Sequence, residues 1–377
     1  MVTGEMKCFG ARQLVVRRST IALTRTKLPP CLMFIRLFVG FFAVALAGSG
    51  ALRAWDSAGH RMVNRIALAS LPPDFPDFVR DPQSVERITF LASEADRWRN
   101  VSDPALMHSG GSWSDHFLDF EQIPLAGLDL ESLPSFRYDF VVAFAAGRAA
   151  HRDRFPLIDR ATNMSHTQEW PGFLPWTIVE HYARVKSAFT YLKTYEEHGT
   201  AEEIAQAKAN VVYLMGVMGH FVGDATQPLH TTDHHSGWVG PNPNGYTTRA
   251  DFHSWIDGGY LAVMGTRLPD LLARVKPAVP LPVGPRPDQR EPVFAAVMNY
   301  MRAQHAFVEP LYQMEKAGQF TMGTDQAVVG RSFLEGQLLK SGEMLGALWL
   351  TAYRNTAPDV FLRTQLLKRQ AAETGVR

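Results

Sequence analysis

The sequence predicts an all-α fold. Residues 178–198 and 201–222 place apolar side chains at a spacing of about 3.6 residues, which is the period of an amphipathic helix. Alternating apolar and polar residues bounded by turns, the pattern of β-strands, are nearly absent. Because 46% of the 377 residues are hydrophobic, the chain is an ordinary globular protein, which excludes disorder and collagen-like repetition.

The first 54 residues predict an export signal. The segment 37–52 carries no charge and lies between Arg36 and Arg53, and a membrane span needs about 20 apolar residues. A basic stretch followed by a short apolar core and small residues is typical of a secretory signal peptide, with cleavage expected after Ala54. Met33 is an alternative start that would shorten the signal, and a retained anchor is the alternative interpretation. We therefore expect a secreted or periplasmic protein without a stable membrane anchor.

The remainder, 55–377, is expected to form one domain with an insertion near 121–175. In order along the chain, the helices are expected at 62–71, 178–198, 201–222, 291–316 and 328–354. Irregular segments are expected at 121–175, at the Gly-, Pro- and Asn-containing stretch 231–250, and at the proline-rich stretch 277–292. The helix at 201–222 begins with acidic residues, which favour a helix N-terminus, and becomes wholly apolar toward its end.

Charge, histidine and cysteine are distributed unevenly. Residues 1–54 hold eight of the 38 Lys and Arg residues but one of the 37 Asp and Glu residues, which leaves a net charge of −6 in 55–377. Both cysteines, Cys8 and Cys31, precede residue 55, whereas all 13 histidines follow it. A zinc site in the mature chain must then use His, Asp, Glu or backbone donors. The acidic charge offers no basic surface for duplex DNA.

The densest motif is HFVGDATQPLH, from His220 to His230. His220 and Asp224 are four residues apart, so their side chains leave one face of a helix. Gly223 and Pro228 are expected to break the helix and to let His230 return toward the same place. The motif therefore predicts three converging metal donors.

Further donors repeat this arrangement elsewhere. His253 and Asp257 again stand four residues apart, and the other donors are His60, Asp96 and His116. Five histidines and three aspartates form a ligand set that zinc accepts when thiolates are absent. One His-x3-Asp pair alone is more often a solvated pair, but so many buried donors without metal would need many compensating hydrogen bonds.

Taken together, these motifs resemble a known family. They are W-x4-H (Trp55–His60), D-x2-R (Asp96–Arg99), H-F-x-D (His116–Asp119), H-F-x-G-D-x-x-Q-P-x-H (His220–His230) and H-x3-D (His253–Asp257). The chain resembles the zinc-dependent phosphodiesterases that include the S1/P1 nucleases and bacterial phospholipase C, from Trp55 through Asp257 and again at 341–349. The resemblance implies a single mostly helical domain of the phospholipase C/P1 nuclease type with long irregular loops.

The resemblance also implies three zinc ions. One would be held by Asp96, His116, His220 and Asp224, a second by His230, His253 and Asp257, and a third by His60, Asp224 and Trp55. Trp55 would bind through its α-amino nitrogen and carbonyl oxygen, and Asp224 would bridge two ions. An α-amino group titrates near pH 8, so it can ligate zinc near neutral pH, but it exists only after cleavage behind Ala54.

Three further residues receive roles from the resemblance. Arg99 would neutralise charge on the phosphoryl oxygens, although an ordinary salt bridge is an equal alternative. Phe117 would stack on a base and Asp119 would hydrogen-bond to it, whereas a core position is the alternative for Phe117. His234 and His235 are expected to be solvent-exposed loop residues, with peripheral metal binding as the alternative.

The predicted function is zinc-dependent hydrolysis of phosphodiester bonds in single-stranded nucleic acid and 3′-nucleotides by a metal-activated hydroxide. The short Trp55–His60 spacing and the His230–His253 spacing favour a nuclease over phospholipase C, as does Asp257. The alternatives are a phospholipase C acting on phospholipid head groups and a non-catalytic helical zinc-binding protein. No protein partner is implied.

Overall fold

The computed structural model describes residues 55–100, 103–107, 113–161, 163, 166–373 and 375. The predicted signal segment at 1–54 lies outside these residues. The described residues belong to one compact unit. Within them no helix has the length and apolar character needed to cross a membrane.

The described part of the chain is helical and contains no β-strand, which confirms the predicted all-α class. The α-helices are α2 (Ser57–Ser70), α3 (Pro82–Leu91), α4 (Glu94–Asn100), α5 (Pro104–Met107), α6 (Gln122–Leu125), α7 (Arg137–Ala150), α8 (Leu174–His198), α9 (Ala201–Thr226), α10 (Phe252–Ser254), α11 (Tyr260–Val263), α12 (Leu268–Leu272), α13 (Pro292–His305), α14 (Val308–Lys316), α15 (Ala327–Arg354) and α16 (Val360–Glu373). Shorter turns are the 3₁₀ helices η1 (Asp77–Arg80), η2 (Trp113–His116), η3 (Leu130–Ser132), η4 (Arg152–Arg154) and η5 (Pro228–Thr231), and the π-helical turn η6 (Trp255–Gly259).

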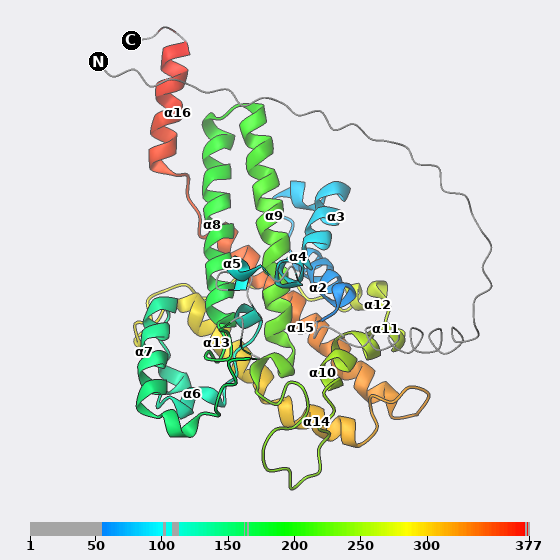
Figure 1. Ribbon diagram of the computed structural model, residues 1–377. Helices are drawn as coiled ribbons and strands as arrows, with labels where there is room; N and C mark the ends of the chain where they lie inside the picture. The colour runs from blue at the N-terminus through cyan, green and yellow to red at the C-terminus, as the bar shows by residue number, and fades with distance from the viewer. Residues whose placement is uncertain are drawn as a thin grey trace, which may run out of the picture. The chain divides into compact units, whose positions relative to one another are not determined.

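The long helices α8 and α9 pack side by side along their length (Figure 1). The turn between them is short because Thr200 caps α9: its hydroxyl accepts from the Glu203 backbone, and the Glu203 carboxylate accepts from the Thr200 backbone. α15 packs against both of these helices and against α2. The C-terminal half of α9 is almost entirely buried, which is why its sequence is apolar all round.

α2 is held between α9 and α15 at very short range. A Cβ atom added at Gly219 of α9 would lie 1.7 Å from Asn64 Oδ1, and one added at Gly342 of α15 would lie 2.2 Å from the Ile66 side chain. The missing side chains therefore allow α2 to approach both helices closely. This packing fixes His60, which α2 carries on its face toward α9.

Most of the expected helices are present. The predictions at 62–71, 178–198, 201–222 and 328–354 correspond to α2, α8, α9 and α15, and the prediction at 291–316 is divided into α13 and α14. The expected helix break at Gly223 is wrong, because α9 continues to Thr226. Gly223 is needed for contact instead: a Cβ there would lie 2.6 Å from the His60 ring. The chain turns at Pro228, where η5 begins.

The segment 121–175 is not irregular throughout, because it contains the 14-residue helix α7. Only Phe140 and Phe144 of α7 are buried, and the Phe140 ring stacks on Trp176 of α8 with 4.0 Å between centroids. The rest of α7 is partly or fully exposed and includes apolar side chains such as Tyr138. One narrow buried stripe is enough to hold this helix on the domain.

Candidate metal centre

The structure brings the eight predicted His and Asp ligands together from seven elements. They are His60 on α2, Asp96 on α4, His116 on η2, His220 and Asp224 at the end of α9, His230 on η5, and His253 and Asp257 on α10 and η6. Each of them is at most 7% exposed. We call them the His/Asp cluster, and they form two groups.

The first group surrounds Asp224. Its Oδ2 atom lies 2.9 Å from His116 Nδ1 and 3.4 Å from His220 Nε2, and its Oδ1 atom lies 3.4 Å from His60 Nε2. Asp96 completes the group, with its Oδ1 atom 3.7 Å from His220 Nε2. Asp224 therefore faces three imidazoles with its two oxygens.

The second group consists of His230, His253 and Asp257. The two Nε2 atoms lie 3.0 Å apart, and Asp257 Oδ2 lies 2.6 Å from His253 Nε2 and 3.9 Å from His230 Nε2. The π-helical turn η6 carries Asp257 directly after the short helix with His253. These three donor atoms converge within 4.8 Å of one another.

Outer hydrogen bonds fix which ring nitrogens face inward. His220 Nδ1 lies 2.8 Å from the carbonyl oxygen of Ala92, and His230 Nδ1 lies 2.6 Å from that of His116. Since a carbonyl oxygen only accepts, both Nδ1 atoms carry the proton, and both Nε2 atoms present a lone pair to the group. The Gln227 side-chain amide likewise donates to Asp257 and orients it.

The electrostatics of the cluster follow from burial. Burial lowers the pKa of His60 and His116 well below the ordinary value, and lowers that of His220 to about 4. Burial and the nearby Asp96 raise the pKa of Asp224 well above its ordinary value. His60, His116 and His220 are therefore neutral, which is the state in which imidazole binds a metal.

Several buried polar atoms in the cluster have no hydrogen-bond partner. They include both ring nitrogens of His60, Nε2 of His116 and Oδ1 of Asp224. Unsatisfied buried polar atoms are costly, and two of these, His60 Nε2 and Asp224 Oδ1, lie 3.4 Å apart. Neutral imidazoles and carboxylates in this arrangement are the donors that divalent ions such as zinc accept. These buried groups could hold metal ions.

Trp55 lies at the edge of both groups. Its side chain is fully buried, and its indole N–H donates to the carbonyl oxygen of Gly223 at 3.0 Å. The next residue, Asp56, donates its backbone N–H to the carbonyl oxygen of Asp257 at 3.1 Å. The start of the described chain is thus attached to α9 on one side and to η6 on the other.

A small cavity of about 70 Å³ opens onto the cluster. It is lined by Arg99, Trp113, His116, Phe117, Leu229, His230, His235 and His253. Arg99 is buried, forms an ion pair with Asp96 at 2.5 Å, and stacks over the Trp113 ring at 4.5 Å. Arg99 therefore forms the salt bridge that was its alternative role and also lines the cavity, and its role at phosphoryl oxygens stays a prediction.

The other two predicted substrate-binding residues, Phe117 and Asp119, lie in different surroundings. Phe117 lines the cavity, whereas Asp119 is absent from its described lining and accepts from the Gln122 side chain at 2.9 Å. The expectation that His234 and His235 are solvent-exposed is wrong, because both are half-buried and His235 lines the cavity. The sequence did not predict that Trp113 lines the cavity, because this residue is not part of any metal-ligand motif.

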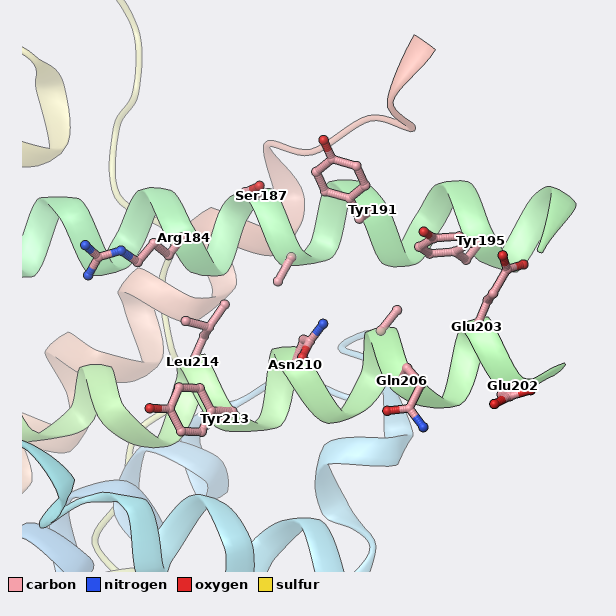
Figure 2. Close-up of a pocket in the computed structure, with 12 residues that line it drawn as sticks. Arg184, Ser187, Tyr191, Tyr195, Glu202, Glu203, Gln206, Asn210, Tyr213 and Leu214 are labelled. Atoms are coloured by element: carbon pink, nitrogen blue, oxygen red, sulfur yellow. The ribbon is translucent and has the colours of Figure 1, made fainter. Parts of the chain in front are cut away.

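A larger groove of about 660 Å³ lies elsewhere, between α8 and α9 (Figure 2). Tyr191 and Tyr195 of α8 line one side of the groove, and Gln206 and Asn210 of α9 line the other. No member of the His/Asp cluster lines it. Size alone therefore does not mark the chemical site, and the small cavity at the cluster is the better candidate.

No model of a protein family matches the sequence, and no curated protein matches it either. The resemblance to zinc-dependent phosphodiesterases therefore depends on the sequence motifs alone.

His181 is a buried histidine beside the cluster that is not one of the predicted ligands. It is 3% exposed, packs on the Phe221 ring at 4.8 Å, and has no hydrogen-bond partner at Nδ1. Burial lowers its pKa to about 3. His181 is thus neutral in the folded protein at every pH near neutrality.

We expect the burial of His181 to lower the free energy of unfolding in mild acid. In the unfolded chain its pKa is near 6.5. The burial of neutral His181 therefore leaves the free energy of unfolding unchanged above pH 6.5. That free energy decreases as the pH drops from 6.5 toward the folded pKa of about 3, because the unfolded chain then binds a proton that the folded chain does not. At pH 5 the loss is roughly 2 kcal/mol. Urea unfolding of the H181Q variant should show a smaller loss between pH 6.5 and 5 than the wild type. Equal losses in the two proteins, or a similar change in H166Q at an exposed histidine, would contradict this.

Proposed function

We propose that this protein is a zinc-dependent phosphodiesterase that hydrolyses single-stranded nucleic acid and 3′-nucleotides. The observation that carries the proposal is the convergence of five histidines and three aspartates, all buried, at a cavity that also holds a buried arginine and aromatic rings. A purely structural metal site has no need of the arginine or of an opening. Both are suited to a phosphate ester.

The identity of the metal as zinc and the number of three ions are part of this proposal. Asp96, His116, His220 and Asp224 would hold one ion, and His230, His253 and Asp257 would hold a second. His60, Asp224 and the main chain of Trp55 would hold the third. When bound, zinc supplies Lewis-acid chemistry at a phosphoryl oxygen and makes water acidic enough to attack near neutral pH.

The chain's own residues would position the substrate. The Arg99 guanidinium, held in place by Asp96 and by the Trp113 ring, would face the phosphoryl oxygens and neutralise the charge that develops there. Phe117 and Trp113 line the cavity, where their aromatic rings would be the surfaces on which unpaired bases stack. Stacking tolerates any base and needs no basic surface, which agrees with the net charge of −6 in 55–377.

The test is a substrate panel on the zinc-loaded protein: single-stranded DNA, RNA, a 3′-nucleotide and phosphatidylcholine vesicles, each with and without chelator. We expect cleavage of the nucleic acids and the 3′-nucleotide, loss of cleavage with chelator, and recovery when zinc is restored. Each ion present at 100 times its Kd adds ~2.7 kcal/mol to stability, so chelation should also lower Tm by several degrees.

The other outcomes identify the competing functions. Cleavage of phosphatidylcholine alone would identify a phospholipase C and overturn the nuclease assignment. Absence of cleavage in every arm, together with a fall in Tm on chelation, would indicate a structural zinc centre.

A further inference from the structure

A second groove lies on the insertion, where α7 ends and the turn η4 follows. Its volume is about 510 Å³, within the range of roughly 300–1,000 Å³ that is common for ligand pockets. Three arginines, Arg148, Arg152 and Arg160, line this groove together with the aromatic residues Phe155 and Trp170. No member of the His/Asp cluster is among its described lining residues. We call it the arginine groove.

Positive charge exceeds negative charge in the arginine groove. Its described lining contains one acidic residue, Glu169, so three arginines and one glutamate leave a net charge of +2. In the described part of the chain none of the three arginines forms a salt bridge. Arg148 is fixed by other contacts, because its guanidinium donates to the carbonyl oxygen of Glu169 at 3.2 Å and lies 4.4 Å from the centre of the Phe155 ring. Arg152 and Arg160 are exposed.

The backbone joins the arginine groove to the small cavity at the His/Asp cluster. Trp170 directly precedes Pro171, whose carbonyl oxygen accepts from the backbone N–H of Asp119 at 2.6 Å. A Cβ atom added at the next residue, Gly172, would lie 2.0 Å from the carbonyl oxygen of Phe117, so the two segments touch there. Phe117 lines the small cavity. Residues that line the groove and the cavity therefore lie on two adjoining segments.

The chemistry of this lining suits a chain of phosphates with unpaired bases. Guanidinium groups keep their charge at any ordinary pH and bind phosphate oxygens through paired N–H donors. Trp170 is half-buried and supplies an aromatic ring, on which a base of any kind can stack. A double helix keeps its bases paired inside, so only a single strand can use the arginines and the tryptophan together.

We infer that the arginine groove binds a segment of single-stranded nucleic acid outside the metal centre. Arg148, Arg152 and Arg160 contact the phosphates, and Trp170 contacts a base. The inference rests on the proposed function, because it takes nucleic acid as the substrate. It gives the insertion the role of holding the strand beyond the bond that is cleaved, and it requires no metal in the groove itself.

The test is the affinity of the zinc-loaded protein for a fluorescein-labelled oligothymidylate of about 12 nucleotides, measured by fluorescence anisotropy at several salt concentrations. Phosphorothioate linkages protect the strand from hydrolysis, so binding is measured apart from cleavage. Arg152→Gln and Arg160→Gln should each weaken binding several-fold. Each should also make the dependence of log affinity on log salt shallower by about 0.7, the value for one phosphate contact of a single strand. Trp170→Leu should weaken binding by about 5-fold or more with the salt dependence unchanged.

Arg154→Gln is the matched control, because Arg154 is exposed and lies in the same stretch of chain but is not among the described residues that line the groove. It should bind the strand like the wild type. Wild-type affinity and salt dependence in both lining variants would overturn the site, as would an equal loss in Arg154→Gln. Should Trp170→Leu fail to fold, the two exposed arginine positions decide.

Failure of this site and failure of the proposed function are distinguishable. A protein that binds the strand through Arg152 and Arg160 but cleaves no nucleic acid would retain the groove and lose the catalytic assignment. A protein that cleaves single strands while both arginine variants bind normally would retain the catalytic assignment and lose the groove.

Discussion

Replacement of Asp224 by Asn is expected to remove the proposed phosphodiesterase activity. Asp224 is fully buried, and its two oxygens face His60, His116 and His220 at 2.9 to 3.4 Å. An amide keeps the shape but presents an N–H₂ group where one oxygen stood and removes the negative charge. Because loss of an outer metal partner already costs ~10–100-fold, loss of a shared ligand should exceed that range. The measurements are kcat/KM on single-stranded DNA and zinc per chain.

The matched control is Asp270→Asn, which makes the same chemical change at an exposed carboxylate paired with Arg267. It should leave activity and zinc content at the wild-type level. An Asp224→Asn protein with full zinc content and substantial turnover would rule out the shared-ligand role.

The helices that the sequence predicts well are those whose information is local. α8, α9 and α15 repeat apolar residues over many turns, so their period is evident without any knowledge of the neighbours. α7 was missed because its exposed face carries Tyr138 and Val142, which hide the stripe made by Phe140 and Phe144. An amphipathic pattern is visible only when the outer face is polar.

Gly223 shows the limit of local rules more clearly. A glycine near the end of a helix normally predicts a break, yet here it lies inside α9 where the His60 ring packs. The reason is a contact with α2, about 160 residues away in sequence, and no window of residues around Gly223 contains it. The close approach of α2 to α9, rather than the backbone propensity of glycine, explains why this position has no side chain.

The ligands of the candidate site were accessible to sequence reasoning because metal donors are few in kind and occur at helical spacings. The way in which these ligands group together could not be predicted, because it depends on how seven elements meet. Residues that shape the cavity without donating to metal, such as Trp113 and His235, carry no such signature. The position of Asp119, whose side chain accepts from Gln122 and does not line the cavity, also carries no signature in the sequence.

The contact between α2 and α9 should be among the least tolerant in the protein. Asn64 is fully buried, and its amide donates to the carbonyl oxygens of Ile88 at 2.8 Å and Gly216 at 3.0 Å. These bonds hold its side chain against Gly219, where an added Cβ would lie 1.7 Å from Oδ1 and 2.6 Å from Cγ. Asn64 cannot move aside without breaking them.

Gly219→Ala is therefore expected to destabilise the zinc-loaded protein by about 3 kcal/mol or more, because overpacking costs ~1–3 kcal/mol and a buried amide that loses its partners costs a similar amount. Urea unfolding should measure this, and zinc content should fall because α2 carries His60. Gly336→Ala in α15 is the control: nothing lies within 4 Å of its added Cβ, so it should stabilise by ~0.5–1 kcal/mol. If both variants had the same stability, helix propensity rather than close approach would govern Gly219.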